Sequence, residues 1–250
     1  MREERKQEEQ GAEKMPTPLE RGRRYRRNAG RQAMNEVVKH TILIVGALFP
    51  IVNPLGGTPI FLSMTQDYSS AERAALSRRV ALNSFVLLVG SLLVGTHILS
   101  FFGISLPVVQ VGGGLIVVST GWTMLNWKQD TEKSETARRQ AGQKDIMQQA
   151  FHPLTLPLTV GPGSISVAIT LGANFPHHAG TNLTALAAAV IGALVTALTV
   201  WMCYGSSERL ARLIGESGMG VIMRLSSFLL VCIGVQIIWN GVSGLLRALG

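Results

Sequence analysis

The chain has 250 residues, of which 47% are hydrophobic and only 15% charged, and its formal net charge is +8 at pH 7. Because about 25% of the residues of a typical soluble domain are charged, this composition argues against a soluble protein and indicates a bilayer protein. The basic residues flank long apolar segments, which is how membrane proteins orient themselves, so nucleic-acid binding is not expected.

The first 33 residues form a basic extension with ten Lys and Arg. They contain no apolar segment of the kind that a signal peptide requires. We expect residues 1–33 to be disordered, or to lie upstream of the true translation start at Met34. The alternative is a cytoplasmic tail that overrides the orientation set by the later loops.

Residues 34–127 are predicted to form a first unit of three membrane-spanning helices. Each predicted span reaches the roughly 20 residues that a helix needs to cross the hydrocarbon. The first span, Val37–Met64, is interrupted by Pro and Gly residues around Asn53-Pro54, whereas Val80–Phe102 and Pro107–Trp127 are uninterrupted.

A cytoplasmic loop is predicted over residues 128–148, followed by a second three-helix unit over residues 149–250. Its first span, Met147–Leu171, is also interrupted, at Pro153, Pro157 and the Gly161-Pro162-Gly163 segment. The spans Leu183–Tyr204 and Leu225–Leu246 are intact. The expected fold is therefore all-α, with six transmembrane helices of which helices 1 and 4 are broken.

Three spans per unit is an odd number, so two related units must cross the membrane in opposite orientations. Both units begin with a broken helix, which predicts two inverted three-helix repeats. Inverted repeats with interrupted helices at matching positions are typical of secondary transporters and of their binding sites.

The basic loops occur at alternate connections, in residues 66–79, 128–148 and 205–224, while the connections 103–106 and 174–182 contain no Lys or Arg. The positive-inside rule then places the basic loops in the cytoplasm and the C-terminus outside. We expect a multi-pass protein of the bacterial inner membrane.

Irregular backbone at membrane depth is tolerated where it lines a cavity or is buried in protein. The interruptions free N–H groups, which favour a carboxylate, and C=O groups, which favour an ammonium group or a small cation. A small zwitterion near the bilayer midplane suits this set of groups. The predicted substrate-binding residues are Asn53, Pro54, Gly56, Gly57, Thr58, Thr159, Gly161, Pro162, Gly163 and Ser164.

The predicted spans contain no interior Asp or Glu, which argues against large anionic substrates and against a carboxylate proton relay. No catalytic group, metal site or cofactor is expected, because the spans lack a nucleophile with a base and a cluster of metal ligands. The coupling ion, sodium or proton, is left open. A small-residue stripe at Ala188, Gly192 and Thr196 predicts close helix packing, with a homo-oligomer contact as the alternative.

The segments Phe49–Phe61 and Phe151–Ser164 resemble the first-helix and fourth-helix signatures of the MarC family of bacterial inner-membrane proteins. The resemblance covers about Met34 to Leu246. It implies transport of small neutral amino acids such as glycine and alanine. The site residues that it implies are Asn53, Pro54, Gly56, Gly57, Thr58, Gly161, Pro162, Gly163 and Ser164. Export of another small metabolite, or a structural or regulatory role in the membrane, is the alternative.

Overall fold

The computed structural model describes residues 18–126, 150–175 and 182–249, and every regular element in these ranges is a helix. The predicted loop 128–148 lies outside the described residues. The elements are α2 (Pro18–Val52), α3 (Pro54–Met64), α4 (Ser70–Phe101), α5 (Leu106–Leu125), η1 (Ala150–Thr159), α8 (Pro162–Ala173), α9 (Asn182–Gly205) and α10 (Ser207–Leu249).

Five segments of the described chain are long and apolar enough to cross a membrane. The pair η1 and α8, which bend by 67° relative to each other, supplies a sixth if it counts as one span. The prediction of an all-helical membrane protein is therefore confirmed, with five candidate spans, or six if the bent pair is one span. The five segments are Gly30–Met64, Ser70–Phe101, Leu106–Leu125, Leu183–Gly205 and Ser217–Ala248.

Two predicted loops are largely helical. Helix α4 begins at Ser70, inside the predicted loop 66–79, and α10 begins at Ser207, inside the predicted loop 205–224. Helix α4 has 32 residues, which gives a length of about 48 Å against roughly 30 Å of hydrocarbon. The charged residues therefore belong to helix ends that extend past the apolar layer. Ser69 and Glu72 form a capping box that starts α4 early.

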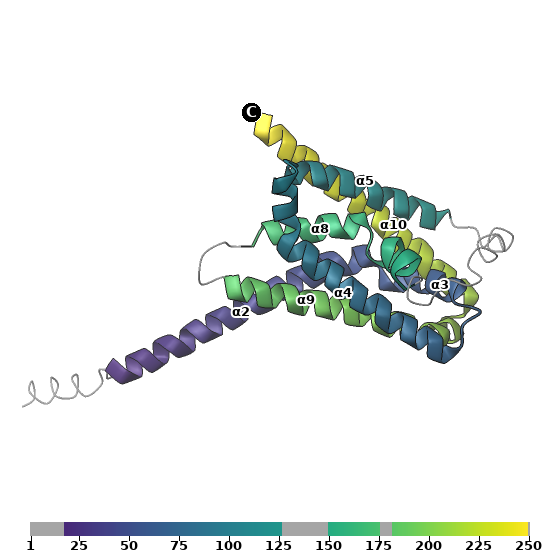
Figure 1. Ribbon diagram of the computed structural model, residues 1–250, viewed down its shortest axis with the longest axis horizontal. Helices are drawn as coiled ribbons and strands as arrows, with labels where there is room; N and C mark the ends of the chain where they lie inside the picture. The colour runs from purple at the N-terminus through teal and green to yellow at the C-terminus, as the bar shows by residue number, and fades with distance from the viewer. Residues whose placement is uncertain (1–17, 127–149, 176–181, 250) are drawn as a thin grey trace, which may run out of the picture.

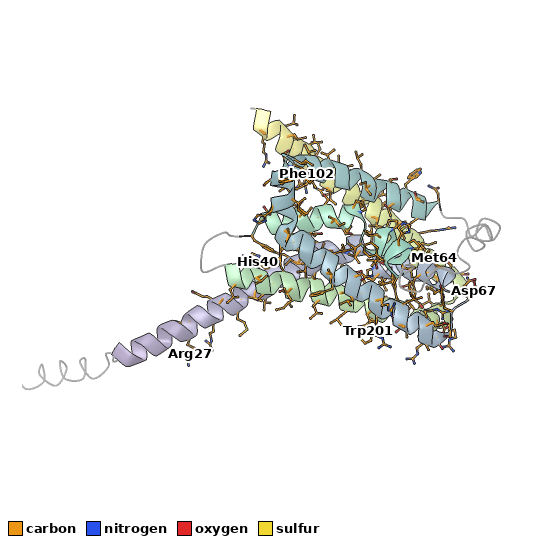
Figure 2. All side chains as sticks on the ribbon, viewed as in Figure 1. Arg27, His40, Met64, Asp67, Phe102 and Trp201 are labelled. Carbon is orange, nitrogen blue, oxygen red and sulfur yellow. The ribbon has the colours of Figure 1, made fainter. Side chains whose placement is uncertain are left out.

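The basic extension is helical from Pro18 onward, which differs from the disorder expected for residues 18–33. Arg, Glu, Gln and Ala are good helix formers, and this segment continues directly into the first span. Figure 1 shows this part of α2 projecting beyond the helix bundle, and Figure 2 places Arg27 on it, far from Asp67.

The helices form a bundle with two distinct ends (Figure 1). The α3–α4 turn, the α9–α10 turn and the end of α5 lie at one end. The start of α2 and the C-terminal end of α10 lie at the other. The predicted basic connections that the structure describes, residues 66–79 and 205–224, therefore lie at the same end of the bundle.

Helices α5 and α10 form the most extensive helix pair, and glycines let their backbones approach closely. A Cβ at Gly114 would lie 2.8 Å from the carbonyl oxygen of Gly234, and a Cβ at Gly234 would lie 2.9 Å from that of Gly114. Small residues at such contacts are how membrane helices gain packing energy without a hydrophobic driving force.

We expect Gly114→Ala to destabilise the protein by about 1–3 kcal/mol, because its new methyl group would meet backbone atoms that cannot rotate away. The matched control is Gly112→Ala on the same helix, where a Cβ would meet nothing within 4 Å. Thermal unfolding of both variants in detergent, followed by circular dichroism, measures the difference. Equal melting temperatures would contradict the close α5–α10 contact.

Candidate functional site

The first span leaves helical geometry at Asn53, between α2 and α3. Asn53 has φ 47° and ψ 57°, a left-handed conformation that Asn adopts more readily than other residues with a side chain. Its Oδ1 accepts a hydrogen bond of 3.0 Å from the Gly56 N–H, which caps α3. Pro54 follows as the first residue of α3, where its missing N–H costs nothing.

The Asn53 side chain also carries an unpartnered donor. Asn53 is only 9% exposed, and its Nδ2 makes no hydrogen bond to any described residue. A buried donor without a partner carries a desolvation penalty of about 1–3 kcal/mol, so such groups are rare and call for an explanation. Asn53 therefore presents a free N–H group beside the N-terminus of α3.

The second interruption lies between η1 and α8. Within η1 the backbone is extended at His152 and Leu156, and the chain turns at Gly161, which precedes the first residue of α8. The hydroxyl of Thr159 donates to the Leu154 carbonyl at 2.7 Å, and the hydroxyl of Ser164 donates to the Gly161 carbonyl at 2.9 Å.

Tyr204 of α9 connects the two interruptions. Its Oη lies 3.0 Å from the Thr159 Oγ1, and a Cβ at Gly57 would lie 2.5 Å from the same Oη. The Tyr204 ring stacks on Phe61 with a centroid distance of 4.5 Å. Tyr204 is fully buried. The phenol thus brings Gly57 of the first interruption and Thr159 of the second to one point.

The sequence did not predict this role of Tyr204. The residue ends an apolar span, and Tyr at that position is typical of the aromatic belt at a membrane interface. The available signal was a single Tyr in an otherwise apolar helix, which does not distinguish an interfacial side chain from a buried one.

The remaining predicted residues are placed differently. Thr58 is fully buried, and its hydroxyl donates to the Pro54 carbonyl at 2.7 Å. Gly163 packs against Val117 of α5, and Pro162 is exposed. Among the described residues, no hydrogen bond joins the segments 53–58 and 161–164. The structure therefore brings Gly57 and Thr159 together at Tyr204, whereas Gly56 lies against the Asn53 side chain and Ser226 of α10.

A buried arginine fixes the far end of α3. Arg73 of α4 is 6% exposed and donates to the Thr65 Oγ1 at 3.1 Å and to the Thr65 carbonyl at 2.7 Å. It also donates to the Tyr68 carbonyl at 3.1 Å and pairs with Glu208 of α10. Arg73 lies in the segment 66–79 that was predicted to be a loop, and this prediction is wrong for Arg73, because α4 begins at Ser70.

Within the described ranges, no group of three or more His, Cys, Asp or Glu could hold a metal ion. The groups that meet at Tyr204 are the Thr159 hydroxyl and the Gly57 backbone, and Asn53 lies one helical turn before Gly57. All of these groups are neutral, so a ligand here would be bound through neutral hydrogen bonds and helix ends.

These features define a multi-pass helical membrane protein with a buried Asn in left-handed conformation in its first apolar segment. The chain belongs to the MarC family: the model of the MarC family integral membrane proteins matches residues 38–246. No solved structure matches the chain.

Several curated relatives bear the name UPF0056 inner membrane protein MarC. The protein from Salmonella typhimurium strain LT2 is 34% identical over 219 residues, which cover 86% of this chain and 99% of the relative. The protein from Citrobacter koseri is 32% identical over 218 residues, covering 86% and 99%. The Escherichia coli O1:K1 protein is 32% identical over 205 residues, covering 80% and 92%.

The contact between Gly57 and Tyr204 is testable by a double-mutant cycle. We expect Gly57→Ala to cost about 1–3 kcal/mol of stability, because the added methyl group displaces the Tyr204 hydroxyl. In a Tyr204→Phe background that hydroxyl is gone, so the same substitution should lose most of its cost.

Unfolding of the four proteins in detergent measures the coupling. Gly46→Ala on α2, where a Cβ meets nothing within 4 Å, is the control and is expected to be neutral or slightly stabilising. An equal cost of Gly57→Ala in both backgrounds would contradict the placement of Tyr204.

Proposed function

We propose that the chain is a secondary transporter of small neutral amino acids of the glycine and alanine class. The substrate is held at the interruption formed by Asn53, Gly56 and Gly57, with Thr159 and Tyr204 completing the site. The substrate passes unchanged, so no catalytic residue is required. Another small exported metabolite, or a non-transport role in the membrane, is the alternative.

The observation that carries the proposal is the buried, unpartnered Nδ2 of Asn53 at the start of α3. A substrate carboxylate would accept a hydrogen bond from this group, and the positive end of the α3 dipole would stabilise its charge. The unpaired donor would then be satisfied whenever substrate is bound.

The ammonium group of the substrate has a partner on the other side of the interruption. Pro54 has no N–H, so it cannot donate to the carbonyl of Pro50 one helical turn earlier. Carbonyl groups freed at the end of α2 attract a cation. In the proposed arrangement an amino acid would lie across the interruption with its carboxylate toward α3 and its ammonium toward α2.

The size of the substrate is limited by the close packing around Tyr204. Tyr204, Thr58 and Phe61 are fully buried, and no space remains for a Cβ at Gly57. Any substrate would require these groups to separate, and a larger side chain on the substrate would require a larger separation. This crowding favours glycine and alanine over larger amino acids.

The helix contacts support the proposed inverted repeat. If α2–α3, α4 and α5 correspond to η1–α8, α9 and α10, most helix contacts of one half have a counterpart in the other. Helix α2 packs on α9 as η1 packs on α4, and α3 packs on α9 as α8 packs on α4. Helix α3 also packs on α10 as α8 packs on α5.

The α5–α10 interface is reciprocal in the same sense. A Cβ at Gly121 would lie 2.9 Å from the Ser227 carbonyl oxygen, and a Cβ at Gly241 would lie 2.6 Å from that of Pro107. The same number of residues separates Pro107 from Ser227, Gly114 from Gly234 and Gly121 from Gly241. The two sets of positions therefore correspond to each other in the two helices. Such pairwise exchange of contacts is expected at a two-fold axis in the membrane plane.

The proposed location is the bacterial inner membrane, because the relatives are named as inner membrane proteins. The end of the bundle with the α3–α4 and α9–α10 turns would face the cytoplasm, because it carries Arg78, Arg79, Arg209 and Arg212. The C-terminus would then face outward. Sodium or protons would supply the driving force.

Uptake of labelled glycine and alanine into proteoliposomes, with sodium and proton gradients imposed separately, tests the function. We expect uptake under one of the two gradients. We expect Asn53→Asp to reduce it at least about tenfold, because a carboxylate keeps the cap on Gly56 but replaces the free donor with an acceptor.

The matched control is Asn126→Asp at the exposed end of α5, outside the site, which should transport like the wild type. Absence of uptake of both amino acids under either gradient would reject the proposed substrate class. Uptake that is unchanged in Asn53→Asp would reject the proposed site.

A further inference from the structure

A second polar site lies at the end of the bundle where α4 and α10 begin. A cavity of about 340 Å³ is bounded there by the first turns of both helices and by the end of α9. The residues of the cavity that carry polar or charged side chains include Ser70, Arg73, Ser207, Glu208, Arg209 and Arg212. Neither Asn53 nor Tyr204 belongs to it.

Ser207 marks this cavity as a binding site. Its side chain is fully buried, and its Oγ has no hydrogen-bond partner among the described residues. Other buried hydroxyls nearby, such as that of Ser77, donate to a carbonyl of their own helix. A buried hydroxyl that lines a cavity without a protein partner is expected to bond to something held in that cavity.

The charge of the cavity favours an anion. Three arginines face one acid, and the acid, Glu208, is already paired with Arg73. Arg209 and Arg212 are exposed and lie three residues apart on α10, so they project from the same face of the helix. The single described hydrogen bond of Arg212 is a long one, 3.4 Å, to the Glu208 carbonyl.

The helix ends add to this preference. The first turns of α4 and α10 both line the cavity, and the first N–H groups of a helix have no partner within it. They point out of the helix start together with the positive end of its dipole. More hydrogen-bond donors are present here than a carboxylate can accept: two guanidinium groups, the N–H groups at two helix starts and one hydroxyl. This set of donors suits the oxygens of a phosphate.

We infer that this cavity binds a phosphate group, held by Ser207, Arg209 and Arg212. The group belongs either to the headgroup of an anionic phospholipid or to free phosphate, since both present the same oxygens. The site lies where charged helix ends extend past the apolar layer, which is the depth of lipid headgroups. It is independent of the transport site, so failure of either proposal leaves the other intact.

Binding by the purified full-length protein distinguishes the two sources. One arm titrates inorganic phosphate in detergent and follows the melting temperature. The other arm uses native mass spectrometry after reconstitution in nanodiscs that contain phosphatidylglycerol and phosphatidylcholine in equal amounts. Saturable binding in both arms supports a general phosphate site, and retention of phosphatidylglycerol alone supports a lipid headgroup site.

Three variants test the residues. We expect Arg209→Gln with Arg212→Gln to weaken binding at least about tenfold, because hydrogen bonds to a charged ligand are among the strongest. We expect Ser207→Ala, which removes only the unpartnered hydroxyl, to weaken it several-fold. Arg224→Gln, on the same helix but outside the cavity, is the control and should bind like the wild type.

Circular dichroism verifies that each variant keeps its helical fold. Absence of saturable binding by the wild type in both arms would overturn the inference. Equal binding by the wild type and the folded Arg209→Gln, Arg212→Gln protein would overturn it as well, because the retained phosphate would then lie elsewhere.

Discussion

The structure depends on one constraint, which is that interrupted backbone inside the apolar layer must be buried and hydrogen-bonded by the protein itself. At Asn53 the left-handed turn is stabilised by the side-chain cap on Gly56 and sealed by α10, whose Ser226 lies against Gly56. The cap uses the oxygen of the Asn53 amide and leaves its nitrogen free. The same side chain thus closes the turn structurally and, in the proposed function, supplies the donor for the substrate.

Helix α3 makes buried side-chain contacts near both of its ends. Tyr204 lies against Gly57 and Phe61 near the start of the helix, and Arg73 binds Thr65 at its end. Because Arg73 also pairs with Glu208, the start of α10 is connected to the same short helix. A change at the cavity beside Ser207 therefore has a physical route to α3 through Arg73.

Much of the fold follows from local sequence features. The apolar segments predict the spans, and Pro54 and Pro162 mark where helices restart, because proline removes a backbone donor. The site was predictable only in part. Asn53 and Gly57 stand in a recognisable Pro/Gly segment, but their connection to Thr159 runs through Tyr204, a contact between residues distant in sequence. The helical start of α10 was missed because charged residues were assumed to end a span, whereas helices extend past the apolar layer.

Amide hydrogen exchange in nanodiscs, with and without saturating alanine, tests the central claim most directly. If the substrate binds at the interrupted helices, alanine slows exchange in peptides covering residues 53–64 and 159–166, because both interruptions meet at Tyr204. We also expect that Asn53→Asp abolishes this protection while Asn126→Asp preserves it. Exchange that is unchanged in both segments, or protection confined to the residues around Ser207, would contradict a substrate site at the interrupted helices.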